Sequence, residues 1–142
     1  MTSSPGALGE SYAAAYLDQL GYRLVAANVT LPVGRNRRGA VVNAEIDLVA
    51  YEGDTLCFIE VKSRASDWFA PPQVNVDLRK RRQITRTARA YRQMLGIEEQ
   101  PYRYDVVTVI LRADSAPQIE LLKNYWTDES VRRKRWGLNF YD

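Results

Sequence analysis

Apolar residues recur at helical spacing over the first twenty residues of the chain. Ser4 can cap a helix, Pro5 suits its first turn, and Gly21 suits the left-handed position at its end. Glu10 projects about 20° from Leu17 at 3.6 residues per turn, so we expect its carboxylate at the edge of the buried face, beside a cleft. The pattern predicts a helix to about Leu20, with an apolar arc made of Leu8, Tyr12, Tyr16, Leu17 and Leu20.

Strand-like runs follow this helix. Residues 22–28 favour a short strand, and residues 31–43 favour an irregular loop or a hairpin. Residues 44–51 and 56–62 are both rich in apolar side chains, and the Glu-Gly-Asp-Thr segment between them suits a tight turn. We therefore expect these two runs to form an antiparallel pair.

The second half of the chain predicts one long helix and two strands. Residues 73–95 have helical spacing, with Ile84, Ala88, Tyr91 and Leu95 on one side and Arg79, Arg82, Arg86 and Arg89 on the opposite side. Residues 104–111 and 118–123 favour strands, and Thr127 can cap a short basic helix that ends at Gly137. The order of elements predicts an α/β fold, a small mixed sheet flanked by helices. We expect one domain over residues 1–142, with its core at about 6–127 and a basic extension at 128–142.

Positive charge is clustered along the chain, although the formal net charge is only +3. The clusters are Arg35, Arg37 and Arg38, then seven cations within the acid-free residues 79–92, then Arg132–Arg135. Clusters of this kind indicate an anionic partner. For any one of them alone, the alternative is a solvated charged face.

The 142 residues include no histidine and one cysteine, which excludes several kinds of chemistry. Ser-His-Asp and Cys-His nucleophiles, imidazole bases and mixed Cys/His zinc sites are all ruled out. Cys57 cannot form an internal disulfide, and we find no signal-peptide core and no stretch apolar enough to span a membrane. A cytoplasmic protein without a membrane partner is the default expectation, and catalysis would have to use carboxylates, lysine or arginine, usually with a metal.

One group of residues has the chemistry for such a site. Glu60 and Lys62 are two residues apart in a strand and so share a face, and Asp47 comes beside Glu60 if the hairpin register places both on that face. Two carboxylates are hard ligands suited to Mg²⁺. A bound cation would polarise a phosphodiester and acidify a water, Lys62 would offset developing charge, and Glu10 could hold a second metal or its waters. Taken singly, each residue also fits an ordinary amphipathic strand or a solvated helix.

The chain resembles the PD-(D/E)XK nuclease superfamily, and within it the YraN-like family of predicted endonucleases, whose fold is related to that of Holliday-junction resolvases. The resemblance covers about residues 6–127. Order and spacing agree over Gly6–Glu10 with Ala14, Leu17, Gly21, Tyr22 and Asn28, over Glu45–Ala50 and Phe58–Arg64, over Lys80–Ile84 with Ala88 and Tyr91, and over Arg103–Val107 and Ile119–Trp126.

The resemblance implies a restriction-endonuclease-like core that binds Mg²⁺ or Mn²⁺ and cleaves DNA, including branched or flapped DNA. It places Glu10, Asp47, Glu60 and Lys62 at catalytic positions, adds the backbone carbonyl of Val61 as a metal ligand, and gives Arg64 and Lys80 positions that face phosphates. Arg79, Arg82, Arg86 and Arg89 would follow the phosphate backbone along one helix face. Resolvase relatives act as dimers, so a homodimer is compatible with this assignment.

Two features depart from the family pattern, and two other functions remain open. Ala44 stands where the family usually has glycine, and the segment 31–43 is longer than usual.

The apolar segment 68–72 after the motif either contacts substrate or folds onto the core. The chain could instead be a non-catalytic nucleic-acid-binding accessory module with the same fold, or a basic structural domain, because fold alone does not fix function.

Overall fold

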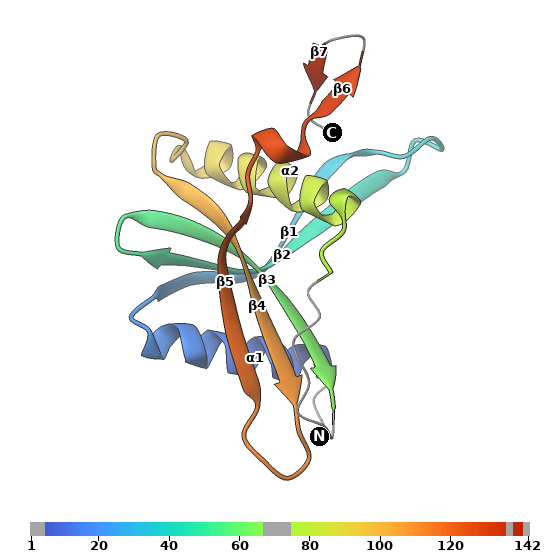
Figure 1. The fold of residues 1–142 in the computed structure, drawn as a ribbon. Helices are drawn as coiled ribbons and strands as arrows, with labels where there is room; N and C mark the ends of the chain where they lie inside the picture. Colours follow the sequence, from blue (N-terminus) through green and yellow to red (C-terminus); the bar gives the residue numbers. More distant parts are fainter. Residues whose placement is uncertain (1–4, 67–74, 136–137, 141–142) are drawn as a thin grey trace.

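A five-stranded mixed sheet with a helix on each face forms the centre of the protein (Figure 1). The computed structural model describes residues 5–66, 75–135 and 138–140. Its elements are α1 (Pro5–Gln19), β1 (Arg23–Arg35), β2 (Val41–Glu52), β3 (Thr55–Ala65), α2 (Leu78–Leu95), β4 (Tyr102–Leu111), β5 (Gln118–Trp126), the 3₁₀ helix η1 (Glu129–Val131), β6 (Arg133–Arg135) and β7 (Leu138–Phe140). The predicted α/β fold with a small mixed sheet flanked by helices is confirmed.

The strand order in the sheet is β1-β2-β3-β4-β5. Only β3 and β4 are parallel, because α2 forms the crossover between them, and every other neighbouring pair is antiparallel. One face of the sheet forms a core with α1 that includes Leu17, Leu48 and Ile59. The other face forms a core with α2 that includes Phe58 and Ile84.

Helix α1 packs against the sheet through small residues. Gly9, Ala13 and Leu17 are buried, whereas Leu8, Tyr12 and Leu20 are exposed, so the predicted apolar arc was wrong in most of its members. The reason is the close approach of the helix to β3: a Cβ atom on Gly9 would lie 2.5 Å from Cβ of Ser63. Bulky side chains are therefore displaced to the flanks of the contact.

Helix α2 begins later than its periodicity predicts. The Asp77 side chain accepts a hydrogen bond from the Lys80 N–H at 2.8 Å and caps the helix, which ends at Gly96 with φ 66°. Ile84, Ala88 and Tyr91 are buried as predicted, but Leu95 in the last turn is 51% exposed. The cap fixes the start at Leu78 in place of residue 73.

Residues 31–43 form a hairpin, which is one of the two structures that the sequence favoured for them, the other being an irregular loop. Strand β1 continues to Arg35 and pairs with β2 as far as Val41. The predicted turn between β2 and β3 is confirmed, with Gly53 at φ 57°. The predicted C-terminal basic helix is wrong, since a single 3₁₀ turn precedes Arg133–Arg135, which pairs with Leu138–Phe140 as a strand.

Segment 68–72 lies outside the described residues. In the part of the chain that the structure describes, neither helix combines the length and the apolar character needed to cross a bilayer.

Candidate functional site

The site lies where β2 separates from β3. Their ladder ends at the pair Leu48 and Ile59. One residue further, Oδ2 of Asp47 accepts a hydrogen bond from the Val61 N–H at 2.8 Å. Ile46 and Leu48, although two apart, belong to the cores on opposite faces, so β2 twists at Asp47. The twist turns this carboxylate toward the gap between the strands.

Asn28 lies on β1 opposite the twisted part of β2 and hydrogen-bonds to two of the acids. It lies between Ala27 and Val29, which pair with Leu48 and Ile46, and its φ is 52°, a left-handed conformation that asparagine tolerates. Its Nδ2 donates hydrogen bonds to Oε2 of Glu10 at 3.0 Å and to Oε1 of Glu45 at 2.7 Å. One amide therefore holds an acid of α1 and an acid of β2 together.

Glu10, Glu45 and Asp47 form an acidic cluster. One carboxylate oxygen from each lies within 4.8 Å of the others, and all three side chains are half-buried. The sequence assigned Glu10 and Asp47 to this site but not Glu45. The signal was available, because Glu45 is two residues before Asp47 on one strand and so shares its face.

The carboxyl groups of the cluster are short of compensating positive charge. Burial, the hydrogen bond to Glu60 and the charges of Glu60 and Glu45 raise the pKa of Asp47 to about 8, against the lowering effect of the Val61 N–H. Burial is also the main cause that raises the pKa of Glu10, with Asp47 and Glu45 adding to it and Asn28 opposing it. A divalent cation would complement this arrangement.

Glu60 joins the cluster from the other face of the sheet. Its side chain is buried, it hydrogen-bonds to Asp47, and Nζ of Lys80 lies 3.7 Å from its Oε2. Asp47 and Glu60 are thus brought together as predicted, but across the strand gap and not as a paired couple of the ladder. Lys80, predicted to face phosphates, contacts this acid from the first turn of α2.

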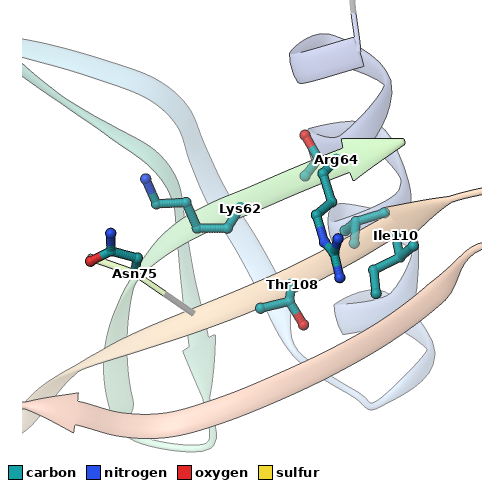
Figure 2. Close-up of a pocket in the computed structure, with 7 residues that line it drawn as sticks. Lys62, Arg64, Asn75, Thr108 and Ile110 are labelled. Carbon is teal, nitrogen blue, oxygen red and sulfur yellow. The ribbon is translucent and has the colours of Figure 1, made fainter. Parts of the chain in front are cut away.

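Lys62 and Arg64 line a small pocket further along β3. The cavity has a volume of about 160 Å³, and its lining includes Asn75 and residues of β4 such as Thr108. Figure 2 shows the Arg64 side chain extending from β3 toward Thr108, whereas the Lys62 side chain extends to the side where Asn75 lies. Lys62 shares the face of β3 on which Glu60 lies, because the two are two residues apart. That the backbone carbonyl of Val61 is a metal ligand stays a prediction.

The arginines of α2 do not form one exposed track. Arg79 is exposed, whereas Arg82, Arg86 and Arg89 are half-buried. Nε of Arg82 donates to the Val131 carbonyl at 2.8 Å, so part of this face is covered by η1. The four arginines therefore do not lie on one solvent-exposed helix face, and their contact with a phosphate backbone stays a prediction.

Comparisons with known proteins give a family but no activity. Residues 9–109 match the model of a family described as "Uncharacterised protein family UPF0102". The chain is similar to a UPF0102 protein of Syntrophus aciditrophicus, at 39% identity over 119 residues that cover 84% of this chain and 85% of the relative. It is 38% identical over 119 residues to one of Geobacter sulfurreducens, with coverages of 84% and 85%. A third, of Chlorobium phaeobacteroides, is 36% identical over 132 residues, with coverages of 90% and 96%.

Proposed function

The chain belongs to the uncharacterised protein family UPF0102, whose name states no activity, and we propose from the geometry of its site that it is a metal-dependent endonuclease. Its substrate would be the phosphodiester backbone of DNA, including branched or flapped forms. The observation that carries the proposal is the meeting of Glu10, Glu45 and Asp47 at the strand gap, with Glu60 bonded to Asp47.

The topology supports the proposal. A mixed sheet with one parallel pair, a helix on each face, and acids on β2 and β3 fits the restriction-endonuclease-like core of the PD-(D/E)XK superfamily, which the YraN-like motifs resemble. The fold by itself would not select a nuclease, since one fold serves many functions. The placement of the acids at the strand gap supplies the chemical argument.

Mg²⁺ or Mn²⁺ fits the donor set. The donors are carboxylate oxygens, and the raised pKa of Asp47 reflects negative charge that the chain leaves uncompensated. Asp47 and Glu60 would hold the cation, with Glu10, Glu45 and the Val61 carbonyl as further ligands. When bound, the cation would neutralise charge on the phosphate and make an attacking water more acidic.

The protein's own residues would orient the groups and offset charge. The Val61 N–H fixes the Asp47 carboxylate, and Lys80 lies against Glu60. In hydrolysis the water oxygen bonds to phosphorus and the bond to the leaving sugar oxygen breaks. Of the two water protons, one is balanced by protonation of that leaving oxygen, and the other stays on the phosphate product or is released to solvent. Lys62, on the Glu60 face of β3, would stabilise the negative charge that develops on the phosphoryl oxygens.

Basic residues around the site would hold the rest of the nucleic acid. Arg64, which lines the pocket beside Lys62, and the exposed Arg79 would contact phosphates. Arg82, Arg86 and Arg89 would add to the positive field of α2. Contacts of this kind position a backbone and do not read bases. Symmetric cleavage of two strands would need two copies of the chain.

A cleavage assay tests the proposal. We would incubate the chain with linear duplex, single-stranded, flapped and four-way-junction DNA in Mg²⁺, in Mn²⁺ and in chelator. Cleavage is expected only with metal, and Asp47→Asn or Glu60→Gln should lower it by about a hundredfold or more. Glu120→Gln, an exposed acid on β5, is the matched control and should cleave normally. Cleavage that survives either site variant contradicts the mechanism.

A non-catalytic nucleic-acid-binding module is the second candidate, favoured by the basic residues that lie outside the acidic cluster. It predicts salt-sensitive DNA binding that is indifferent to chelator, with no cleavage of any of the four substrates. The same assay, with binding measured in parallel, separates the two functions.

A further inference from the structure

The β1–β2 hairpin continues beyond the site as a two-stranded arm, which we define as residues 29–46. Pairing of β2 with β3 ends at Leu48, but pairing with β1 continues to the couple Arg35 and Val41. Figure 1 shows this hairpin, in cyan, passing beside α2 and extending beyond the rest of the sheet. The acidic cluster therefore lies at the foot of the arm.

The foot of the arm is packed, whereas its tip is exposed. Ile46 is buried and Val29 and Leu31 pack against the core under α2. Every residue from Gly34 to Val41 is exposed. The arm is therefore anchored to the core at one end and exposed to solvent at the other.

The turn at the tip is built by internal hydrogen bonds. Oδ1 of Asn36 accepts hydrogen bonds from the N–H groups of Arg38 at 2.9 Å and Ala40 at 3.0 Å. The Asn36 N–H donates to the Ala40 carbonyl at 2.9 Å, and Nη1 of Arg35 donates to the Gly39 carbonyl at 2.7 Å. This local network presents three arginines on an ordered turn.

Glu45 at the foot of the arm belongs to the acidic cluster, and beyond it the charge of the arm is of one sign. Arg35, Arg37 and Arg38 are its only ionisable side chains between Val29 and Ala44. Strand β1 is also poorly suited to pair with a strand of another protein, because it is an edge strand that carries Pro32 and shifts of register near Leu24 and Pro32. A polyanion fits this surface better than a partner strand.

The length of the arm fixes where that polyanion would be contacted. Val41, opposite Arg35, is six residues from Asp47 along β2. At about 3.3 Å per residue, the tip lies roughly 20 Å from the site, which corresponds to about six base pairs of duplex. A two-stranded ribbon also has the width that the DNA major groove admits.

Resting on the proposed nuclease function, we propose that the arm binds the phosphate backbone of duplex DNA about six base pairs from the bond that is cleaved. The arm thereby selects substrates with a duplex segment on one side of that bond. The three arginines contact phosphates, so the contact increases affinity without reading sequence.

The test measures DNA binding at several salt concentrations in the Asp47→Asn background, which prevents cleavage. Flapped DNA is supplied with a duplex side of about 4 or about 12 base pairs, around the six-base-pair reach estimated from the strand rise. The variant replaces Arg35, Arg37 and Arg38 by glutamine. Arg23→Gln, an exposed cation at the other end of β1, is the matched control.

Loss of the arginines should weaken binding to the long duplex by about ten- to a hundredfold and lower the slope of log K against log salt by about 2–3. Binding to the short duplex and binding by the Arg23→Gln control should change little. Equal losses on both lengths, or no loss, would overturn the role of the arm alone. If the Asp47→Asn protein with its arm intact binds neither DNA at low salt, both the role of the arm and the proposed nuclease function are overturned. A variant that loses self-association but keeps DNA binding identifies the arm as an interface between copies and also overturns the proposal.

Discussion

The Asp47 carboxylate and the Val61 backbone N–H are hydrogen-bonded at 2.8 Å at the point where β2 leaves β3. The bond replaces the ladder contact that β2 no longer makes there, so the N–H is satisfied while the strands separate. The same carboxylate bonds to Glu60 and lies beside Glu45 and Glu10. The gap in the sheet is therefore lined by acids, which is an arrangement that favours a ligand over stability.

Replacing Asp47 by asparagine should make the metal-free protein more stable. The pKa of Asp47 is about 8 in the folded state and 3.8 in the reference state, so the folded state keeps a proton that the unfolded state releases. The contribution of protonated Asp47 to the stability of the wild-type protein is therefore lost as the pH rises from about 4 to about 8. We expect Asp47→Asn to unfold at a higher temperature at pH 8 in chelator, by roughly 2–8 °C, which corresponds to about 1 kcal/mol.

Thermal unfolding at pH 5 and pH 8 checks this prediction. The difference between Asp47→Asn and wild type should widen toward pH 8 and narrow when Mg²⁺ is added, because only the wild-type site gains from the metal. Glu120→Gln should show no such pH dependence. A difference that stays constant, or one in favour of wild type, is incompatible with this account.

Gly9→Ala should destabilise the protein and displace Glu10. The added Cβ would lie 2.5 Å from Cβ and 2.6 Å from Oγ of Ser63, so α1 must move away from β3. Overpacking of this kind costs about 1–3 kcal/mol, measurable by urea unfolding. Gly6→Ala is the control, since nothing lies within 4 Å of the added atom and alanine favours the helix. Equal stability of the two variants would show that the contact is not tight.

Glu45→Gln should weaken metal binding although the sequence alone did not assign this residue to the site. It removes one of three clustered carboxylates but keeps an oxygen that can accept the Asn28 hydrogen bond. Titration calorimetry with Mn²⁺ should show an affinity lower by about ten- to a hundredfold. Glu120→Gln should bind as wild type does. An unchanged affinity in Glu45→Gln would remove Glu45 from the proposed ligand set.

A second network on the α1 side of the sheet should be important for stability. Arg103 Nε donates to the fully buried carboxylate of Asp105 at 2.9 Å, and its Nη2 donates to Tyr22 and Glu52 at 2.8 Å. Arg103→Met should cost about 3–5 kcal/mol, because Asp105 keeps a buried charge without its cation. The double variant with Asp105→Asn should recover part of that loss in urea unfolding. Additive losses would show that the pair is not coupled.

Local sequence signals predicted most of the elements but not the geometry of the strand gap. Proline, glycine and apolar periodicity located α1, the β2–β3 hairpin and the end of α2. The buried face of α1 was missed because Gly9 and Ala13 have little apolar surface, and their importance depends on the closeness of β3. The C-terminal strand was missed because its formation depends on pairing with β7.

The candidate site was predicted in most of its acids, with Glu45 missed, but not in their arrangement. Spacing gave Glu60 and Lys62 a shared face, and it made Asp47 a neighbour of Glu60 only under one hairpin register. Strict alternation could not reveal the twist that places Ile46 and Leu48 in different cores. Asn28 matched the family pattern without any assigned role. Its contacts with Glu10 and Glu45 depend on the left-handed backbone at that position, which is set by tertiary structure.

Anomalous scattering from crystals soaked in Mn²⁺ is the most direct test of the central claim, that the carboxylates at the strand gap form one metal centre. The account predicts a peak at about 2.2 Å from carboxylate oxygens of Asp47 and its neighbours in the cluster, and no peak in Asp47→Asn crystals treated in the same way. A wild-type crystal without a peak at the gap, or with manganese only at exposed acids such as Glu120, would contradict it.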